Sequence, residues 1–538
     1  MNIQFADAWE CVAENYPNRT AVVCDGVGVS WRDYEVRASK IAALLAEAGL
    51  SKGAKVGLYL KNCNEYHEAQ FGVLKVGGCP INVNYRYKAD ELVYLLDNAD
   101  AEAIFYQASY AMRIWEIKDR LPKVKLFVQV NDGTEALMDF AIDYERSMRD
   151  HQPLARQERD PDGLYMFYTG GTTGLPKGVM YRVGAFAEFF INMGAATQAL
   201  APPSDLSEYD KFLASVAVPP ITVVGCPLMH GTGMWLGGFL PHLLGGTSVV
   251  TSKLGLDPDL LWDMVETQCA TDLVIVGDAF ARPLLEALDG AKARGTPYDL
   301  SSLKQISSSG VMWSEEVKQG LLAHHDMVLA DIMGSTEGSM GSSMTTRQSV
   351  RGTAKFDLSD GVSVITEDDR FVQPGSGEIG RIATSAFVPI GYYKDEAKSA
   401  ETFREVDGVR YSFPGDFATV EADGSISLLG RGSVCINTAG EKVFPEEVEE
   451  VLKKHPGVVD CLVVGIADEK FGQKVVAVVQ GANAEQIDAS DLKEFCETHL
   501  ASYKLPRSIV WVPQVQRAPN GKPDYKWALK QTERASQS

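Results

Sequence analysis

Residues 168–178 read Tyr-Thr-Gly-Gly-Thr-Thr-Gly-Leu-Pro-Lys-Gly, and this stretch decides how the rest of the chain is interpreted. Its glycines permit positive φ angles, so backbone N–H groups can converge on an anion, while threonine hydroxyls and Lys177 add donors and a positive charge. Apolar runs at 164–168 and 179–181 predict buried strands on either side. The stretch therefore predicts a loop that binds a polyphosphate and is held between two strands.

This loop is not a Walker loop. That motif requires Gly-x-x-x-x-Gly-Lys-Ser/Thr, whereas Gly174 is followed here by Leu175, Pro176 and Lys177. A loop rich in glycine and threonine is also typical of an exposed hairpin, which is the alternative when the stretch is taken alone. The motifs that follow it along the chain favour the phosphate loop.

Composition limits the classes of function. The chain has 538 residues, more than one hydrophobic core usually supports, so at least two domains are expected. A net charge of −21 disfavours a general nucleic-acid binder. Nine cysteines without a Cys-x-x-Cys pair, and an N-terminus without a secretory pattern, predict a reduced, cytoplasmic setting. The most apolar stretch, 213–229, is broken by prolines and a glycine, which predicts a buried loop or strand pair and no membrane span.

Helix and strand signals alternate along most of the chain, a pattern that predicts a mostly parallel sheet covered by helices. Helices are expected at 38–48, 66–74, 89–96, 185–200 and 258–266, and strands at 55–60, 81–85, 103–106, 248–250 and 273–276. A compact α+β unit is expected towards the C-terminus, with helices at 444–454 and 491–500 and strands at 459–464, 475–479 and 508–512. The predicted domains are 1–430 and 431–538.

Four further motifs carry polar groups. Residues 334–337, Gly-Ser-Thr-Glu, offer a hydroxyl and a carboxylate that suits Mg²⁺, although a helix N-cap is the commoner use of such a tetrapeptide. Asp416 follows a turn and can accept hydrogen bonds from ribose hydroxyls or close an Asx turn. Arg431 is expected at the domain junction. Lys522 lies on a loop of glycine and proline, where a lysine is usually only solvated.

Taken in order, the loop at 168–178, residues 334–337, 411–416 and 430–445, and Gly521-Lys522 resemble the core motifs of the adenylate-forming superfamily. This superfamily comprises acyl-CoA synthetases, firefly luciferases and peptide-synthetase adenylation domains, and the resemblance covers essentially the whole chain. It implies an α/β fold, with a large N-terminal domain of layered αβ subdomains and a small mobile α+β C-terminal domain. It also implies an AMP-forming acyl-CoA synthetase, closest to bacterial fatty-acid and steroid-side-chain CoA ligases, that uses ATP, Mg²⁺ and CoA.

The resemblance implies a role for each matching residue. Lys522, Thr336 and Glu337 are expected to carry adenylation, with Glu337 as the Mg²⁺ ligand. The acyl pocket is expected at His230, Gly231, Met234 and Gly310, and the CoA contacts at Gly440 and Lys442. The expected ATP site comprises Thr169, Gly170, Gly171, Thr172, Thr173, Gly174, Lys177, Gly310, Val311, Asp331, Met333, Gly334, Ser335, Thr336, Asp416, Arg431 and Lys522.

Several positions depart from the family pattern, namely Gly170, Met333, Pro414, Ser433 and Ala439. Met333 stands where an aromatic residue usually stacks on adenine, so adenine is expected to pack on a thioether. None of these departures removes the lysine, the arginine or the two carboxylates named above, so activity is expected.

The substrate is expected to be a medium- or long-chain fatty acid or a bulky, ring-bearing acid. Small residues at Gly231, Gly233, Gly237, Gly238 and Gly310 predict room for such an acyl group. An aromatic acid is the alternative substrate, and a luciferase-like oxidoreductase or a non-catalytic adenylate-binding protein is the alternative function. The expected partners are the acid, ATP and CoA, with no nucleic acid, and the sequence allows a homodimer without requiring one.

Overall fold

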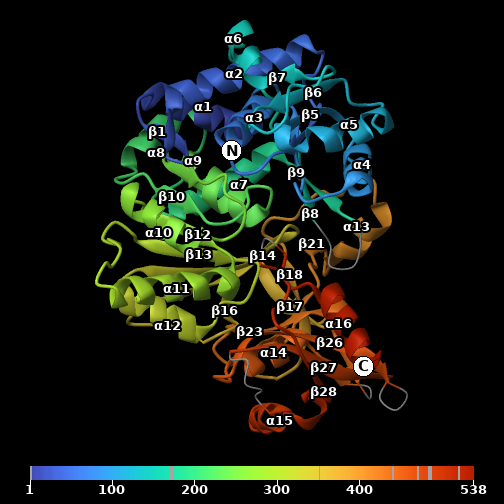
Figure 1. The fold of residues 1–538 in the computed structure, drawn as a ribbon. Helices are drawn as coiled ribbons and strands as arrows, with labels where there is room; N and C mark the ends of the chain where they lie inside the picture. Colours follow the sequence, from blue (N-terminus) through green and yellow to red (C-terminus); the bar gives the residue numbers. More distant parts are fainter. Residues whose placement is uncertain are drawn as a thin grey trace.

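A computed structural model describes residues 3–169, 175–349, 352–438, 441–468, 472–482, 488–518 and 521–537. Figure 1 shows a large N-terminal body, coloured blue to yellow, and a smaller C-terminal part in red beneath it. The predicted α/β architecture of a large and a small domain is confirmed.

A parallel five-stranded sheet lies in the N-terminal third, as the alternating pattern predicts. Its order is β4 (Cys79–Asn82), β3 (Lys55–Tyr59), β5 (Ala101–Gln107), β6 (Leu126–Val130) and β7 (Ile142–Asp143). The helices of this third are α2 (Trp31–Glu47), α3 (Asn64–Lys75), α4 (Ala89–Asn98), α5 (Ala111–Ile117) and α6 (Tyr144–Asp150). Alternate strand residues enter different cores: Phe105 joins the main cluster with α2 and α3, whereas Ile104 packs with α4 and α5.

A second, larger sheet is parallel only in its first half. The parallel strands run in the order β1 (Thr20–Cys24), β11 (Thr247–Val250), β10 (Ile221–Val224), β12 (Asp272–Ile275), β13 (Gln305–Ser309) and β14 (Val328–Ser335). The antiparallel strand β2 (Val27–Ser30) edges it, and helices α10 (Pro258–Thr267), α11 (Gly277–Ala293) and α12 (Glu315–His324) connect its strands.

The other half of this sheet is antiparallel, which the alternating pattern did not indicate. It begins at the hairpin of β14 with β15 (Gly338–Thr345), so residues 334–337 form a hairpin turn and not a helix N-cap. It continues through β16 (Lys355–Leu358), β23 (Ile426–Arg431), β22 (Asp416–Val420), β18 (Gly380–Thr384), β21 (Val409–Ser412) and β20 (Phe403–Val406), with β17 (Val362–Ile365) paired to β18. A short helix, α13 (Glu396–Thr402), precedes β20.

The opening motif lies on a hairpin. Strands β8 (Leu164–Thr169) and β9 (Lys177–Arg182) pair in register from Leu164 opposite Arg182 to Thr169 opposite Lys177, and β19 (Gly391–Tyr392) extends the sheet. The two flanking strands are therefore confirmed, whereas residues 170–174 lie outside the described residues. Helix α7 (Val183–Thr197) follows β9 directly.

The apolar stretch 213–229 contributes one strand, β10, and not the strand pair that was one of the two predicted forms. It follows α8 (Tyr209–Ser215) and leads into a π-helical segment, Thr232–Phe239, and α9 (Leu240–Leu243). A Cβ at Gly233 would lie 2.3 Å from the Pro227 carbonyl oxygen, and one at Gly237 would lie 2.5 Å from Val224. Gly237 lets the segment pack on β10, and Gly233 lets it pack on the chain just after β10. Neither glycine lines the cavity described below, so the prediction that these two leave room for an acyl group was wrong.

The C-terminal part is an α+β unit, as predicted. Its sheet runs β25 (Glu441–Val443), β24 (Ile436–Thr438), β27 (Gly472–Gly481) and β26 (Val458–Asp468), with β28 (Ser508–Trp511) parallel to β27. Helices α14 (Pro445–Lys453) and α15 (Ala489–Glu497) pack on one face, and α16 (Tyr525–Gln537) packs on the other. The large sheet ends with β23 and the small one begins with β24; the limits 1–430 and 431–538 stay a prediction.

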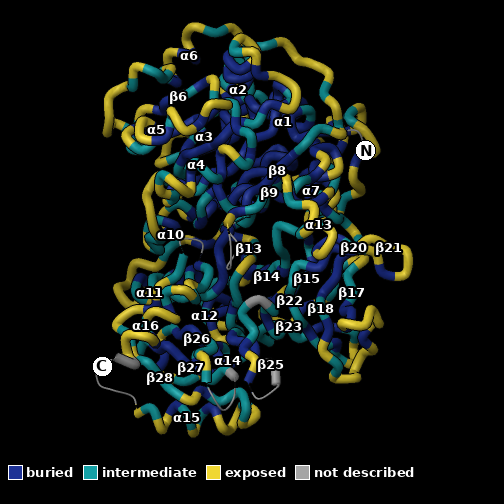
Figure 2. The backbone as a smooth tube through the Cα atoms, turned by 90° about the vertical axis from the view of Figure 1, so that its right-hand side faces the viewer, coloured by how far each residue is buried: buried dark blue, intermediate teal, exposed yellow. Residues whose placement is uncertain are grey.

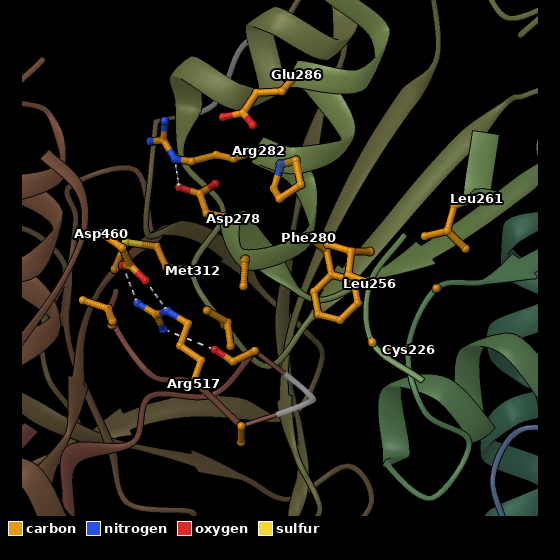
Figure 3. Close-up of a pocket in the computed structure, with 18 of the residues that line it drawn as sticks. Cys226, Leu256, Leu261, Asp278, Phe280, Arg282, Glu286, Met312, Asp460 and Arg517 are labelled. Atoms are coloured by element: carbon orange, nitrogen blue, oxygen red, sulfur yellow. Dashed lines mark hydrogen bonds and ion pairs between the residues drawn. The ribbon is translucent and has the colours of Figure 1, made fainter. Parts of the chain in front are cut away.

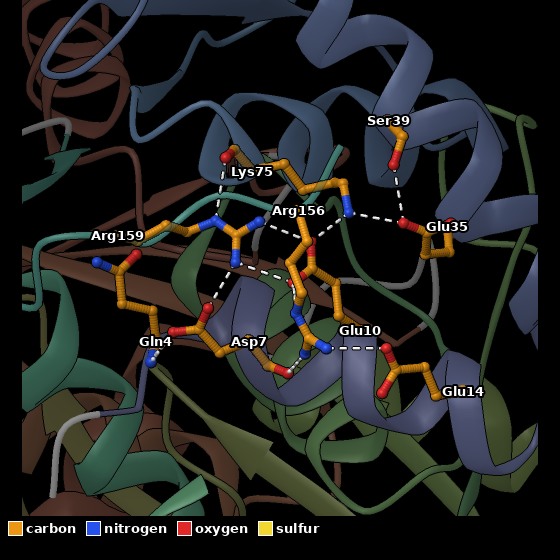
Figure 4. Close-up of polar contacts among 9 residues, drawn as sticks. All are labelled: Gln4, Asp7, Glu10, Glu14, Glu35, Ser39, Lys75, Arg156 and Arg159. Carbon is orange, nitrogen blue, oxygen red and sulfur yellow. Dashed lines mark hydrogen bonds and ion pairs between the residues drawn. The ribbon is translucent and has the colours of Figure 1, made fainter. Parts of the chain in front are cut away.

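Helix α1 (Phe5–Asn15) is fixed by buried charges as well as by apolar contacts, and Figure 2 shows it within the dark-blue interior. Glu10 forms ion pairs with Lys75 and Arg159, and Arg159 also pairs with Asp7 at 2.5 Å (Figure 4). The Glu10, Lys75 and Arg159 side chains are each at most 4% exposed. The buried charges compensate one another, and because they come from α1, α3 and the chain before β8, the cluster joins these three segments.

Candidate active site

A cavity of about 730 Å³ lies at the carboxyl ends of β13 and β14, where ligands of open α/β sheets usually bind. Its polar lining includes Thr169 of β8, Gly310 after β13, Gly334 and Ser335 at the end of β14, Thr336 directly after β14, and Lys522 from the C-terminal part. His230 and Gly231 line the same space. The fold thus brings together eight predicted residues that are spread over 354 positions of the chain (169 to 522, counted inclusively).

Lys522 lines the cavity from the C-terminal loop, next to Gly310. Gly310 has a φ of +90°, which only glycine adopts readily, and a Cβ there would lie 4.0 Å from Lys522 Cε and 3.8 Å from Thr232 Oγ1. Burial, reinforced by the positive charge of Arg431, lowers the pKa of the Lys522 ammonium to about 8, although Glu337 and Asp416 oppose the shift. The ammonium is therefore poised to lose its proton slightly above neutral pH.

His230 is a neutral polar group at the cavity wall. Burial, with Lys522 and Arg86 nearby, lowers the pKa of its imidazole to about 3. Within the described part of the chain its buried Nε2 has no hydrogen-bond partner. A buried nitrogen without a partner costs free energy unless a ligand or water satisfies it, so this atom fits a site that binds a polar group.

Glu337 and the loop lysine are joined through an aromatic residue. The Tyr392 hydroxyl donates to Glu337 Oε1 at 2.8 Å, and Lys177 Nζ lies 5.5 Å from the Tyr392 ring centroid. Lys177 also pairs with Asp395 at 2.6 Å. Among the described residues there is no cluster of three or more acidic, histidine or cysteine side chains that could hold a metal. One carboxylate is nevertheless enough for Mg²⁺ that a bound polyphosphate also ligates.

Asp416 and Arg431 face each other on neighbouring strands. They are register partners in β22 and β23, and Arg431 Nε lies 3.4 Å from Asp416 Oδ1. The charge of Asp416, with help from Glu337, raises the pKa of the Arg431 guanidinium. Buried Asp416 Oδ2 has no partner within the residues described, which suits an acceptor for ligand hydroxyls.

Lys177, Glu337, Asp416 and Arg431 do not line this cavity themselves, and four further predicted residues, Asp331, Met333, Met234 and Val311, do not line it either. Asp331 is buried and pairs with Lys318 at 3.0 Å, and burial raises the pKa of its carboxyl to about 6. Met333 packs in the core of the antiparallel half with Met340 and Phe356. Met234 is buried in the main core, and Val311 lines the second cavity described below. Strand alternation explains the first two, because Ile332 and Gly334 face the cavity and their neighbours face away.

Part of the cavity wall is aromatic. Phe186, Phe189, Phe190 and Met193 of α7, Trp235 of the π-helical segment and Phe387 line it. The Phe387 ring is nearly parallel to that of Tyr181, at 5.1 Å and 4°, and to that of Phe189, at 5.0 Å and 15°. Such a wall accommodates a large apolar group and offers it flat faces.

A second cavity, of about 1100 Å³, lies between the two parts of the chain. Asp278, Arg282 and Met312 line it from the large domain, and Asp460 and Arg517 line it from the small one (Figure 3). Ala518 lines both cavities, while Gly521 lines the second and Lys522 the first. The loop that carries Lys522 therefore forms part of the wall between them.

Several predicted residues cannot be placed. Gly170, Gly171, Thr172, Thr173, Gly174 and Gly440 lie outside the described residues, as does Ala439. Lys442 belongs to β25 by its backbone. The predicted roles of these residues in ATP and CoA binding stay predictions.

Comparison with known proteins identifies the family. A family model described as AMP-binding enzyme matches residues 9–390, and the AMP-binding enzyme C-terminal domain matches residues 447–522. The chain belongs to the AMP-binding enzyme family. The superfamily predicted from the ordered motifs is thereby confirmed, and with it the enzyme class, an AMP-forming ligase.

Similar sequences cover the whole length of this AMP-binding enzyme. A 3-oxocholest-4-en-26-oate–CoA ligase of Rhodococcus rhodochrous is 37% identical over 99% of this chain and 96% of its own. A medium/long-chain-fatty-acid–CoA/3-oxocholest-4-en-26-oate–CoA ligase of Mycobacterium marinum is 38% identical over 99% and 97%. An anthranilate CoA ligase crystallised with anthranoyl-AMP shares the fold, with a TM-score of 0.84, 21% identity, and coverage of 99% and 98%.

Sequence reasoning missed residues that shape this site. Tyr392 and Asp395, which contact Glu337 and Lys177, follow a glycine at the start of a short strand and carry no recognisable motif. Asn82 donates to the Tyr168 and Met229 carbonyls at 2.8 Å, tying the loop strand to the chain before His230. Trp235 directly follows Met234 of the predicted acyl pocket, and this adjacency was the one signal in the sequence that could have indicated a role for Trp235 in the site.

Proposed function

We propose that the protein is an acyl-CoA ligase that activates a medium- or long-chain fatty acid or a bulky, ring-bearing acid such as a steroid side-chain carboxylate. The observation that carries this proposal is a single cavity whose lining combines a group of aromatic side chains with Thr336 and Lys522. The printed activities of relatives that match over essentially the full chain support the same acids.

In the first half-reaction the acid's carboxylate oxygen bonds to the α-phosphorus of ATP, and the bond to the β-phosphate oxygen breaks. The products are acyl-AMP and pyrophosphate. Negative charge develops on the α-phosphate oxygens, and we assign Lys522 and Thr336 to stabilise it. Asp416 would accept hydrogen bonds from the ribose hydroxyls through its unpaired oxygen.

A metal ion is expected to assist this step. Bound Mg²⁺ would neutralise phosphate charge, and Glu337 would supply a carboxylate ligand to it. Tyr392 would orient that carboxylate, because its hydroxyl donates to one of the two oxygens.

In the second half-reaction the thiolate of CoA bonds to the acyl carbonyl carbon, and AMP leaves with the electron pair of the broken anhydride bond. We assign the second cavity to the approach of CoA, since it shares the loop wall with the acyl cavity. The predicted contacts of Gly440 and Lys442 belong to this part of the proposal. Movement of the small domain would separate the two half-reactions.

Pyrophosphate exchange tests the proposal directly. The exchange of labelled pyrophosphate into ATP is measured with saturated acids of increasing length, a steroid side-chain acid, benzoate and anthranilate, and CoA consumption is then measured with the acids that work. Exchange with long or ring-bearing acids followed by thioester formation is expected. Preference for the two aromatic acids would favour the alternative substrate, and no exchange with any acid would refute the proposal.

A further inference from the structure

Arg517 holds the backbone next to Lys522. It lies on the C-terminal loop, and its guanidinium donates from Nε and Nη2 to the two oxygens of Asp460 at 2.6 and 2.7 Å. The remaining nitrogen, Nη1, donates to the carbonyl oxygen of Gly521 at 3.2 Å (Figure 3). One planar group thus connects a strand of the small domain, β26, with the residue that precedes Lys522.

The described residues of this loop make further contacts. The Ala518 N–H donates to the Lys522 carbonyl at 2.9 Å, and the Gly521 N–H donates to the Ala518 carbonyl at 2.8 Å. Gly521 has a φ of +71°, and a Cβ there would lie 3.0 Å from that of Ala279 in the large domain. The direction of the Lys522 side chain therefore depends on where the Gly521 peptide lies.

The Arg517–Asp460 pair is a firm support for this peptide. The Arg517 side chain is only 13% exposed and that of Asp460 21%, and Lys453 approaches Asp460 at 3.4 Å. Burial alone would raise the pKa of Asp460, but the hydrogen bonds from Arg517 and the charge of Lys453 hold it at about 2. A bidentate, charge-assisted pair of this kind fixes orientation as well as distance.

We propose that Arg517 is a positioning residue for adenylation: it transmits the position of β26 to the Gly521 carbonyl and so keeps the Lys522 ammonium in the acyl-adenylate cavity. This inference rests on the proposed function, in which Lys522 serves the first half-reaction and not the second. Arg517 itself lines the second cavity and touches no reacting atom.

Arg517→Gln separates positioning from simple loss of stability, because the small domain serves both half-reactions. Pyrophosphate exchange should fall 10- to 100-fold, since a misplacement of about 1 Å can cost 10²-fold. Thioester formation from supplied acyl-adenylate is measured at saturating CoA, because Arg517 lines the second cavity and its loss can raise the KM for CoA. Under that condition the rate should change less than twofold. The matched control is Lys504→Gln, which removes another ion pair of the small domain, to Glu447 at 2.5 Å, and should leave both rates unchanged.

A double mutant shows whether the effect passes through Lys522. In a Lys522→Ala background, adding Arg517→Gln should leave the residual exchange unchanged, because the group that it positions is absent. Arg517→Lys should recover part of the exchange, since a lysine can keep the pair with Asp460 but cannot also reach Gly521. A further full loss in the double mutant, or a parallel fall in both half-reactions, would overturn the inference.

A labelling experiment tests the inference without requiring activity. The acetylation rate of Lys522 by acetic anhydride at pH 8, measured by mass spectrometry and normalised to that of half-exposed Lys454, should rise several-fold in Arg517→Gln. An unchanged rate would overturn the inference. Absence of exchange in the wild-type enzyme with every acid would instead refute the proposed function, while the labelling result would still report the position of Lys522.

Discussion

The depressed pKa of Lys522 predicts an alkaline limit to adenylation. The perturbation is pH, and the group that responds is the ammonium, whose pKa burial and Arg431 lower to about 8 from a usual value of 10.5. Only the protonated form can stabilise the α-phosphate charge. Adenylation should therefore be at its maximum below this pKa, where the Lys522 side chain is protonated, and should fall as pH rises through it.

The magnitude follows from the titration of one group. With a pKa of about 8, roughly a tenth of the lysine is protonated at pH 9, so kcat/KM for ATP in pyrophosphate exchange should be about one tenth of its value at neutral pH. A lysine with an ordinary pKa would leave the same quantity almost unchanged at pH 9. The assay is exchange between pH 7 and 9.5 at constant free Mg²⁺, with kcat/KM chosen because it reports the free enzyme.

Two variants test the cause of the shift. Glu337→Gln removes a negative charge that raises the pKa of Lys522, so the alkaline fall should move to lower pH. Arg431→Gln removes a positive charge that lowers this pKa, so the fall should move to higher pH. Both variants should also be slower overall, but the position of the fall does not depend on the absolute rate. A flat profile up to pH 9.5, or shifts in one direction for both variants, would refute the reasoning.

Three further predictions concern stability and substrate choice. His242 is buried with its Nε2 2.9 Å from the Ala21 carbonyl oxygen, and burial lowers its imidazole pKa to about 4. As pH falls from about 6.5 to 4, the unfolded chain should bind this proton first, so the free energy of unfolding should decrease by up to roughly 3 kcal/mol, and His242→Gln should flatten that dependence in urea titrations. Lys75→Met should lower the free energy of unfolding by about 3 kcal/mol because it leaves buried Glu10 with less compensation. Lys123→Met, at an exposed pair, should change the free energy of unfolding much less, and equal effects of the two substitutions would contradict the role of burial. Phe189 is part of the aromatic wall of the acyl cavity, so Phe189→Ala should lower kcat/KM for long or ring-bearing acids by about 10- to 100-fold and leave kcat/KM for butyrate nearly unchanged. An equal loss for both kinds of acid would show that Phe189 does not select the substrate.

The sequence predicted the site best where a motif depends on backbone conformation. The hairpin around the phosphate loop follows from glycines between two apolar runs, and the strands indeed pair from Leu164 to Thr169. The helix expected at 444–454 is α14, because Pro445 begins it and acidic residues occupy its first turn. These signals are local, so they survive without knowledge of tertiary contacts.

The errors arise where one residue decides which face of an element is turned to the ligand. The family resemblance assigns Asp331 and Met333 to the ATP site with Gly334, but on β14 both residues point away from the cavity. For the glycines of the π-helical segment, the sequence does not show whether the absence of a side chain leaves space for a ligand or allows close packing on the neighbouring backbone. Only the packing of Gly233 against Pro227 and of Gly237 against Val224 shows that they serve the fold.

The C-terminal loop links the two cavities in a way that orders the chemistry. Ala518 lines both, Gly521 the second and Lys522 the first, so the segment that supplies the ammonium is also part of the partition. A displacement that withdraws Lys522 must therefore change the wall between the two cavities. Under the proposed function, a thiol in the second cavity would gain access only when the ammonium has left. Under the proposed function, acyl-AMP forms behind a closed partition, protected from the thiol and from water. Arg517 lines the second cavity and pairs with Asp460. Its hydrogen bond to the Gly521 carbonyl would favour the arrangement in which Lys522 lies in the first cavity. The hydrogen bond from Arg517 to Gly521, which we propose positions Lys522, would thus also help to keep thioester formation after adenylation.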